Sequence, residues 1–249
     1  DIIIGAHAAD PNGDYSGESY VVFGKSAGYS ASLELSALDG TNGFVINGID
    51  AGDLSGFSVS SAGDINNDGY DDIIIGASYA DPNGLESGES YVVFGKASGT
   101  YSASLELSSL NGTNGFVING IDAYDSSGRS VSSAGDINND GYDDIIIGAY
   151  GADTGKGESY VVFGKDTSFP AALDLSALDG NNGFVINGID AGDFSGKSVS
   201  SAGDINNDGY DDIIIAAFIA DNYAGESHVV FGQSEFDAFV NLSDLALLA

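Results

Sequence analysis

Acidic loops of one pattern recur along the chain. The first, at 64–72, reads Asp-Ile-Asn-Asn-Asp-Gly-Tyr-Asp-Asp, and the same residues return at 136–144 and 204–212. Oxygen-bearing side chains stand at loop positions 1, 3, 5 and 9, and a glycine at position 6 permits a sharp turn. Hard cations such as Ca²⁺ take about six to eight oxygen ligands from carboxylates, amides and backbone carbonyls. The loops therefore predict calcium sites.

Each predicted site uses the side chains at positions 1, 3, 5 and 9 and the backbone carbonyl at position 7. Position 8 is not expected to touch the ion. The chain begins with an aspartate that matches position 9 of a further, truncated loop. The predicted calcium ligands of the three complete sites and the truncated one are Asp64, Asn66, Asp68, Tyr70 and Asp72; Asp136, Asn138, Asp140, Tyr142 and Asp144; Asp204, Asn206, Asp208, Tyr210 and Asp212; and Asp1.

The alternatives for these loops are an EF-hand and a metal-free Asn-Asp-Gly turn. An EF-hand needs a glutamate at loop position 12 and a helix after it, but position 12 here is Ile75, inside an apolar run. A metal-free turn would leave four carboxylates to repel one another in each loop. With no Cys and only 2 His in the chain, zinc and copper are disfavoured.

The charge balance limits the possible partners. The chain has 38 acidic and 6 basic residues, a formal net charge of −32. Such a surface repels nucleic acids and anionic lipids, so neither nucleic-acid binding nor membrane insertion is expected. Apolar runs are too short for a transmembrane helix. The lack of an initiator Met and of a signal-peptide pattern suggests a mature piece or a trimmed fragment.

A repeat of about 70 residues organises the whole chain. The run Asp-Ile-Ile-Ile starts at Asp1, Asp72, Asp144 and Asp212, and Gly-Glu-Ser, Phe-Gly and Asn-Gly-Phe-Val-Ile-Asn recur between these points. Runs of β-branched and aromatic residues alternate with Gly, Asn, Asp and Ser, which predicts four short strands in each repeat. In the best-defined repeat these are 57–62, 72–77, 90–95 and 115–120.

The strands differ in a way that predicts their packing. The second strand, 72–77, is a continuous apolar run, so both of its faces must be covered by other sheets. The first strand, 57–62, consists mostly of small residues, which suit a place where several sheets converge on an axis. Four-stranded sheets arranged in this way form a β-propeller. A solenoid is the alternative, although its usual period is shorter, about 20–50 residues.

These motifs resemble FG-GAP repeats, the blade unit of the integrin α-subunit propeller. The resemblance rests on Ser-Gly-x-Ser-Val at 55–59, on the aspartate loop, and on Ile-Gly-Ala at 75–77, where Ser78 replaces the family's proline. It implies a seven-bladed ring with calcium loops on one face and adhesion or ligand binding on the other. This all-β chain would hold about three and a half antiparallel blades, half of such a ring. As one repeat domain, 1–249, it would divide into partial blade 1–52, blade 53–124, blade 125–192 and partial blade 193–249.

Strand order places the loops on two opposite faces. The aspartate loops define one, which we call the aspartate-loop face. The loops between second and third strands define the other, the variable-loop face, because they differ most between copies. Phe57, Arg129 and Lys197 stand at equivalent places near it. This face is the predicted recognition surface; the alternative is unconstrained variation in exposed loops. The variable loops are 10–17, 81–88, 153–157 and 221–225.

No catalytic constellation emerges, because neither His7 nor His228 has a repeated Ser or Asp partner at a suggestive spacing. We therefore predict a non-catalytic, calcium-stabilised binding or adhesion module, outside the cell or on its surface. Its partner would be a protein or polysaccharide on the variable-loop face, or further copies of itself. A structural sheath, surface-layer or filament repeat, and a carbohydrate-binding appendage of a larger secreted enzyme, remain open alternatives.

Overall fold

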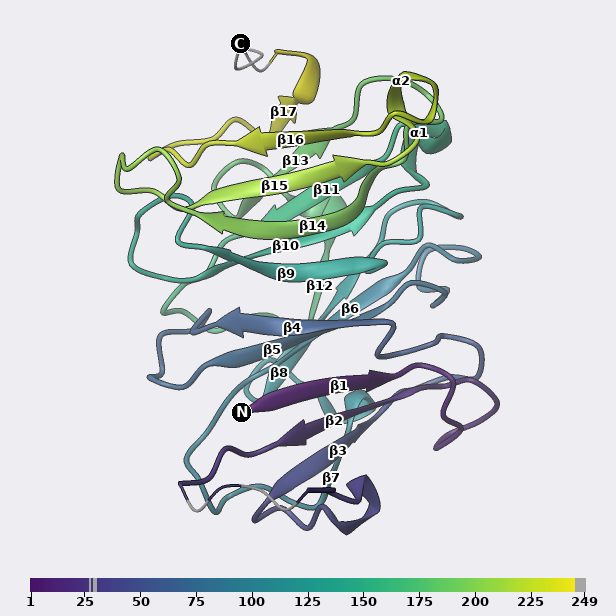
Figure 1. Cartoon of the computed structure of the whole chain (residues 1–249), viewed down its shortest axis with the longest axis vertical. Coiled ribbons are helices and arrows are strands. Elements are labelled where there is room, and N and C mark those ends of the chain that lie inside the picture. Colours follow the sequence, from purple (N-terminus) through teal and green to yellow (C-terminus); the bar gives the residue numbers. More distant parts are fainter. Residues whose placement is uncertain (27, 29–30, 245–249) are drawn as a thin grey trace.

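Four β-sheets lie one on another along the long axis of the computed structural model, which describes residues 1–26, 28 and 31–244 (Figure 1). The chain builds the four sheets one after another, and the consecutive strands of each repeat pair antiparallel within their sheet. The protein is all-β, as predicted, with only short helical turns. The described sheets form an open stack of propeller-type blades and not a closed barrel.

The sheets share one order of strands. The first contains β1 (Ile2–Ala6), β2 (Glu18–Val22), β3 (Gly43–Asn47) and β7 (Ser104–Glu106). The second contains β4 (Ser58–Gly63), β5 (Asp72–Ala77), β6 (Glu89–Val93), β8 (Gly115–Asn119) and β12 (Ala172–Asp174). The third contains β9 (Ser130–Gly135), β10 (Asp144–Ala149), β11 (Glu158–Val162), β13 (Gly183–Asn187) and β17 (Phe239–Asn241). The fourth contains β14 (Ser195–Gly203), β15 (Asp212–Ala217) and β16 (Glu226–Val230).

Short helical turns occupy some of the connections. Helices α1 (Ala152–Gly155) and α2 (Ala220–Tyr223) lie in the variable loops of the third and fourth sheets. Four 3₁₀ turns precede or follow the outermost strands, at Leu35–Ala37, Leu107–Ser109, Leu175–Ala177 and Leu242–Asp244. The predicted final connection began at residue 241; its part beyond 244 lies outside the described residues.

The second strand of each inner sheet is buried on both faces, as its continuous apolar run predicted. In β10, Ile145, Ile146 and Ile147 are all fully buried. Ile145 and Ile147 belong to the core between the second and third sheets, whereas Ile146 belongs to the core between the third and fourth. Alternate side chains therefore pack against different neighbours, and every sheet interface has its own hydrophobic core.

The first strands of successive sheets pack directly against each other. Their small serine side chains permit this approach and also bond across it. The backbone N–H of Val131 in β9 donates to the Ser58 hydroxyl of β4 at 3.1 Å, and Val199 in β14 donates to Ser130 of β9 at 3.1 Å. The small residues of the first strand thus serve the convergence of sheets that their size predicted.

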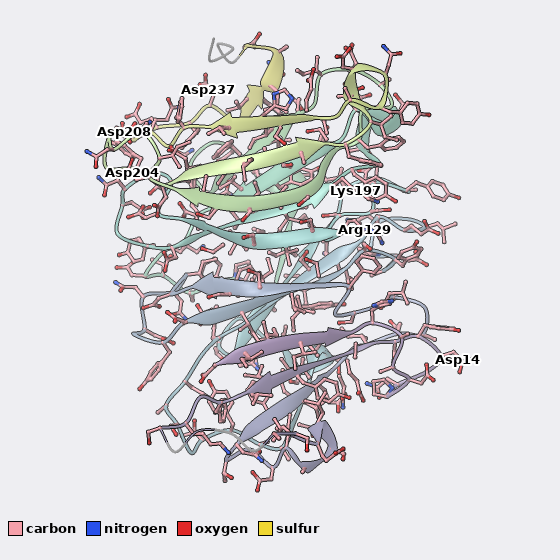
Figure 2. The ribbon with its side chains drawn as sticks, in the orientation of Figure 1. Asp14, Arg129, Lys197, Asp204, Asp208 and Asp237 are labelled. Atoms are coloured by element: carbon pink, nitrogen blue, oxygen red, sulfur yellow. The ribbon has the colours of Figure 1, made fainter. Side chains whose placement is uncertain are left out.

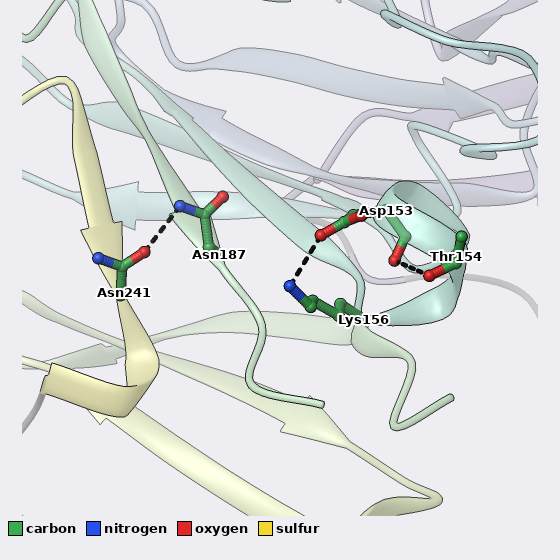
Figure 3. Close-up of polar contacts among 5 residues, drawn as sticks. All are labelled: Asp153, Thr154, Lys156, Asn187 and Asn241. Carbon is green, nitrogen blue, oxygen red and sulfur yellow. Dashed lines mark hydrogen bonds and ion pairs between the residues drawn. The ribbon is translucent and has the colours of Figure 1, made fainter. Parts of the chain in front are cut away.

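A strand that was not predicted joins each sheet to the one before it. β7, β12 and β17 leave the connection after a third strand and pair in parallel with the outermost strand of the preceding sheet. Asparagine side chains support these pairs, and Figure 3 shows Asn187 donating to Asn241 at 3.0 Å. The second and third sheets therefore have five strands in place of the four predicted.

The same connections carry aromatic rings into the interface cores. Phe169 stacks on Phe116 at 4.4 Å between ring centroids, and Phe236 stacks on Phe184 at 4.1 Å. Tyr101 takes the equivalent place on Phe44 at 4.7 Å. In each pair one ring comes from the outermost strand of a sheet and the other from the following repeat, so the stacked pairs hold neighbouring sheets together.

Glycines mark the closest approach between sheets. A Cβ atom built on Gly148 of β10 would lie 2.0 Å from the carbonyl oxygen of Gly196, near the start of β14. Gly76 meets Gly128 in the same way, at 1.9 Å. In the fourth sheet the equivalent residue is Ala216, and no further sheet packs on it among the described residues.

The outer faces of the stack expose residues that are buried in the inner sheets. Ile4 is 39% exposed, whereas Ile75 and Ile147, its equivalents, are fully buried. At the other side of the stack, Ile205 is 55% exposed, whereas its equivalent Ile137 is fully buried. Burial of these positions thus depends on a neighbouring sheet, and not on the repeat alone.

Candidate metal centres in the aspartate loops

The aspartate loops join the first and second strands of the second, third and fourth sheets and lie on one face of the stack. Figure 2 shows Asp204 and Asp208 at that face, with Arg129 and Lys197 at the opposite one. Each loop follows a bulge at the end of the first strand. Strand pairing therefore fixes both ends of the loop, and the three copies take the same shape.

Hydrogen bonds inside the loop gather its side-chain oxygens. In the first loop, the backbone N–H of Asp68 donates to both Asp64 Oδ1 and Asn66 Oδ1 at 2.9 Å. The N–H of Gly69 donates to Asp64 Oδ2 at 2.9 Å, and that of Tyr70 donates to Asp68 Oδ1 at 3.0 Å. Positions 1, 3 and 5 therefore turn toward the inside of one turn.

The other two loops repeat this arrangement. The bonds from position 5 to positions 1 and 3 measure 2.9–3.0 Å in both. Asn67, Asn139 and Asn207, at position 4, adopt left-handed backbone conformations with φ of 54°, 56° and 60°. Asparagine tolerates this region better than most residues, which explains its recurrence at a position that supplies no predicted ligand.

Position 9 places a buried carboxylate beneath each loop. Asp72 is buried, and its two oxygens accept bonds from the N–H groups of Gly95 at 2.7 Å and Ile65 at 3.1 Å. Burial raises the pKa of Asp72 to about 7 against the lowering effect of the Gly95 bond, and the charges of Asp68 and Asp64 raise it further. The charges of the neighbouring aspartates thus act on a carboxyl group that is shielded from water.

Asp144 and Asp212 repeat the contacts of Asp72. The N–H of Gly164 donates to Asp144 Oδ1 at 2.9 Å, and that of Gly232 donates to Asp212 Oδ1 at 3.0 Å. Burial raises the pKa of Asp144 to about 8. These glycines belong to the repeated Phe-Gly pair at the end of the third strand. Position 9 thus joins the second strand to the third, a role that the sequence did not reveal.

Asp1, the predicted remnant of a fourth loop, has the same partner as its equivalents. Its Oδ1 accepts a bond from the N–H of Gly24 at 2.6 Å. The aspartate therefore keeps the position-9 geometry although the rest of its loop is not in this chain. Its role as a ligand of a truncated site stays a prediction.

The donor set of each complete loop suits a hard cation. It combines carboxylate oxygens with an amide oxygen around one turn. Among residues 1–26, 28 and 31–244, no three His, Cys, Asp or Glu side chains already form a metal-binding cluster. Each predicted set includes three aspartates, at positions 1, 5 and 9, so these side chains do not form a preformed cage in the described structure. The fit to Ca²⁺ rests on the types of donor in the loop.

Position 8 has a function that was not predicted. Asp143 reaches from the third sheet to the second, where its Oδ2 accepts the N–H of Asp64 at 2.8 Å. Asp211 accepts the N–H of Asp136 in the same way at 3.0 Å. A Cβ atom on Gly63 would lie 2.2 Å from Asp143 Oδ2, so the glycine makes room for this bond. In the third and fourth sheets, position 8 thus links the aspartate loop to that of the preceding sheet.

Replacing Asp143 by alanine should destabilise the chain, since the N–H of Asp64 would lose a charged acceptor. Hydrogen bonds to charged groups contribute about 1.5–3 kcal/mol, so thermal unfolding should shift down by roughly 3–10 °C for a chain of this length. The matched control is Asp71→Ala, because Asp71 occupies the same loop position but has no such bond among the described contacts. Equal melting temperatures for both variants would refute this role.

A second set of carboxylates lies near the variable-loop face. Burial raises the pKa of Asp53 and of Asp125 to about 6, and the charges of Glu89 and Glu158 add to the respective shifts. Each of these glutamates also accepts a bond from a tyrosine hydroxyl two residues along its strand. These pairs are Glu89 with Tyr91 and Glu158 with Tyr160.

Comparison with known proteins now assigns the repeat. A model of the FG-GAP repeat matches residues 55–93, 127–162 and 195–230. This chain is built from FG-GAP repeats. Each matched segment starts at or just before the first strand and runs through the aspartate loop and second strand to the end of the third strand. The fourth strand and the parallel joining strand lie outside the matched segments.

Integrin α subunits are similar to this FG-GAP chain. It is 30% identical to integrin alpha-5 of Xenopus laevis over 175 residues, which cover 67% of this chain and 15% of that protein. It is 28% identical to integrin alpha-V of Gallus gallus, with 67% and 15% covered, and 27% identical to integrin alpha-PS2 of Drosophila melanogaster, with 72% and 12% covered. The chain thus spans a small part of each relative's length.

Proposed function

We propose that this FG-GAP chain is a non-catalytic binding or adhesion module, stabilised by Ca²⁺ and located outside the cell or on its surface. The recurrence of one oxygen-rich loop in three sheets, with the same internal hydrogen bonds each time, carries this proposal. The similarity to integrin α subunits supports the adhesion role. The proposed ligands are those predicted from the loop positions, with Asp1 as part of a further site.

Calcium would act as a structural ion in these loops. It would neutralise the carboxylates that crowd between the end of the first strand and the start of the second, where Asp72 and its equivalents are buried. Because position 8 links neighbouring loops, an ordered loop would also support the sheet interface. Sites of this kind work where calcium is abundant, since extracellular modules bind it at about 10⁻⁴–10⁻³ M.

The variable-loop face is the proposed place for a protein or polysaccharide partner. Its loops expose aromatic side chains: Tyr15 is 57% exposed, Tyr124 59% and Tyr223 81%. Aromatic residues on loops held by a rigid scaffold favour recognition of another molecule. No helix in the described part of the chain has the length and apolar character needed to span a membrane.

Isothermal titration with CaCl₂, after removal of bound metal, tests the proposal. We expect one ion for each complete loop, and Asp68→Asn, Asp140→Asn and Asp208→Asn should each remove one of them. Asp71→Asn, which also removes one loop carboxylate, should leave the number of bound ions unchanged. If the position-5 variants bound as many calcium ions as the unchanged chain, the calcium assignment would be overturned.

A further inference from the structure

Two cationic side chains lie beside each other on the variable-loop face. Arg129 immediately precedes β9 and Lys197 lies within β14, at equivalent places in successive sheets, and Figure 2 shows both near the same edge of the stack. In the second sheet the equivalent residue is Phe57. Another repeat position, just after the second strand, places Tyr150 and Phe218 nearby.

Aromatic rings hold both cations in place. The guanidinium carbon of Arg129 lies 3.6 Å from the centroid of the Phe57 ring. Lys197 Nζ lies 3.6 Å from the centroid of Tyr150 and 5.8 Å from that of Phe218. Contacts of this kind orient a cation and leave its outer side available to an anion. Both side chains are half-buried, which strengthens their interaction with a charged ligand.

Neither cation has an acidic partner, although acidic residues outnumber basic ones by 38 to 6. Neither residue takes part in the ion pairs recorded between described residues, such as Lys156 with Asp153 and His228 with Glu226. Burial lowers the pKa of Lys197, and the adjacent charge of Arg129 lowers it further. Two half-buried cations without a counter-ion are costly in free energy, and an anionic ligand would remove that cost.

We propose that Arg129 and Lys197 bind a carboxylate group of a polypeptide partner, with the aromatic rings forming the sides of the site. The inference rests on the proposed binding function and names the chemistry of its ligand. Two adjacent donors, one of them a planar guanidinium, match a single carboxylate.

The charge of the rest of the chain favours a polypeptide over an acidic polysaccharide. With a formal net charge of −32, the chain repels a ligand that carries a negative charge on every unit. The buried carboxylates of Asp53 and Asp125 add to this repulsion near the same face. A polypeptide with one acidic residue among neutral ones meets the cation pair without that penalty.

Nuclear magnetic resonance titration of the calcium-loaded, ¹⁵N-labelled chain tests the inference. The probe is an acetylated and amidated Gly-Ser-Gly-Asp-Gly-Ser-Gly peptide, compared with the same peptide carrying Asn in place of Asp. We expect the backbone amide resonances of Arg129 and Lys197 to shift as the Asp peptide is added, until the shifts saturate. The Kd should be near 1 mM, as for a single small contact. The Asn peptide should bind at least tenfold more weakly.

The variants Arg129→Gln and Lys197→Gln should each weaken the binding of the Asp peptide at least tenfold. Lys165→Gln is the matched control, because Lys165 also lies over an aromatic ring, Phe169 at 4.6 Å, but begins the connection on the aspartate-loop side. Unchanged melting curves confirm that the variants fold.

Three outcomes would overturn the inference. The first is that the Asp and Asn peptides bind with equal affinity, or that neither peptide saturates the chain. The second is an equal effect of Lys165→Gln, and the third is tighter binding of trigalacturonate than of the Asp peptide. Calcium stoichiometry measured on the same sample separates this failure from failure of the proposed function.

Discussion

Removing calcium is expected to lower the thermal midpoint of this chain by more than 10 °C. A ligand that binds only the folded state stabilises it by RT ln(1 + [L]/Kd). At about 10 mM Ca²⁺ and a Kd of about 0.1–1 mM, each site contributes roughly 1.4–2.7 kcal/mol. Three sites together contribute about 4–8 kcal/mol, a large share of the stability of an ordinary domain.

Differential scanning calorimetry in excess chelator, and then after Ca²⁺ is restored, measures this effect. Mg²⁺ should restore less of the stability, because it demands a stricter geometry and loses its water reluctantly. Asp68→Asn should reduce the calcium-dependent part by about one third, whereas Asp71→Asn should preserve it. A melting curve that is identical with and without chelator would rule out structural calcium sites.

Replacing Gly148 by alanine is expected to have the second large effect. The added methyl carbon would lie 2.0 Å from the backbone oxygen of Gly196, so the third and fourth sheets would have to separate. Overpacking in a rigid core costs about 1–3 kcal/mol and occasionally more. Here the opposing atom belongs to the backbone and cannot rotate away, so we expect at least 3 kcal/mol in chemical denaturation.

The fourth sheet supplies the control for this substitution. Ala216→Gly changes the equivalent position, which faces no further sheet among the described residues. It should cost about 0.5–1 kcal/mol, the ordinary backbone penalty for glycine in a strand. If Gly148→Ala were no more harmful than Ala216→Gly, the sheets would not be in contact at this point.

Residue patterns predicted the features of the fold that are local in sequence. The unbroken apolar run of 72–77 matches β5 and its copies, because burial on both faces leaves no alternation. The joining strands were missed because β7, β12 and β17 are three residues long and pair with a different repeat. No local pattern records such a partner.

The same distinction applies to the candidate site. Loop spacing singled out positions 1, 3 and 5, and bonds inside one turn join these positions in the structure. Their role as metal ligands stays a prediction. The bond from Asp64 to Asp143 spans 79 residues, so the sequence gives no sign of it. The same holds for Arg129 and Lys197, whose proximity arises only when successive sheets are stacked.

The glycine contacts also determine which surfaces of the protein can self-associate. Every interface in the stack joins the back of one sheet to the front of the next, a heterologous contact of the kind that builds filaments when nothing stops it. Gly5, Gly76 and Gly148 admit the next backbone, but Ala216 places a methyl group at that point. A sheet that approached the fourth sheet in the same register would meet this methyl group. The change from glycine to alanine that we expect to separate the third and fourth sheets is thus already present on the fourth sheet.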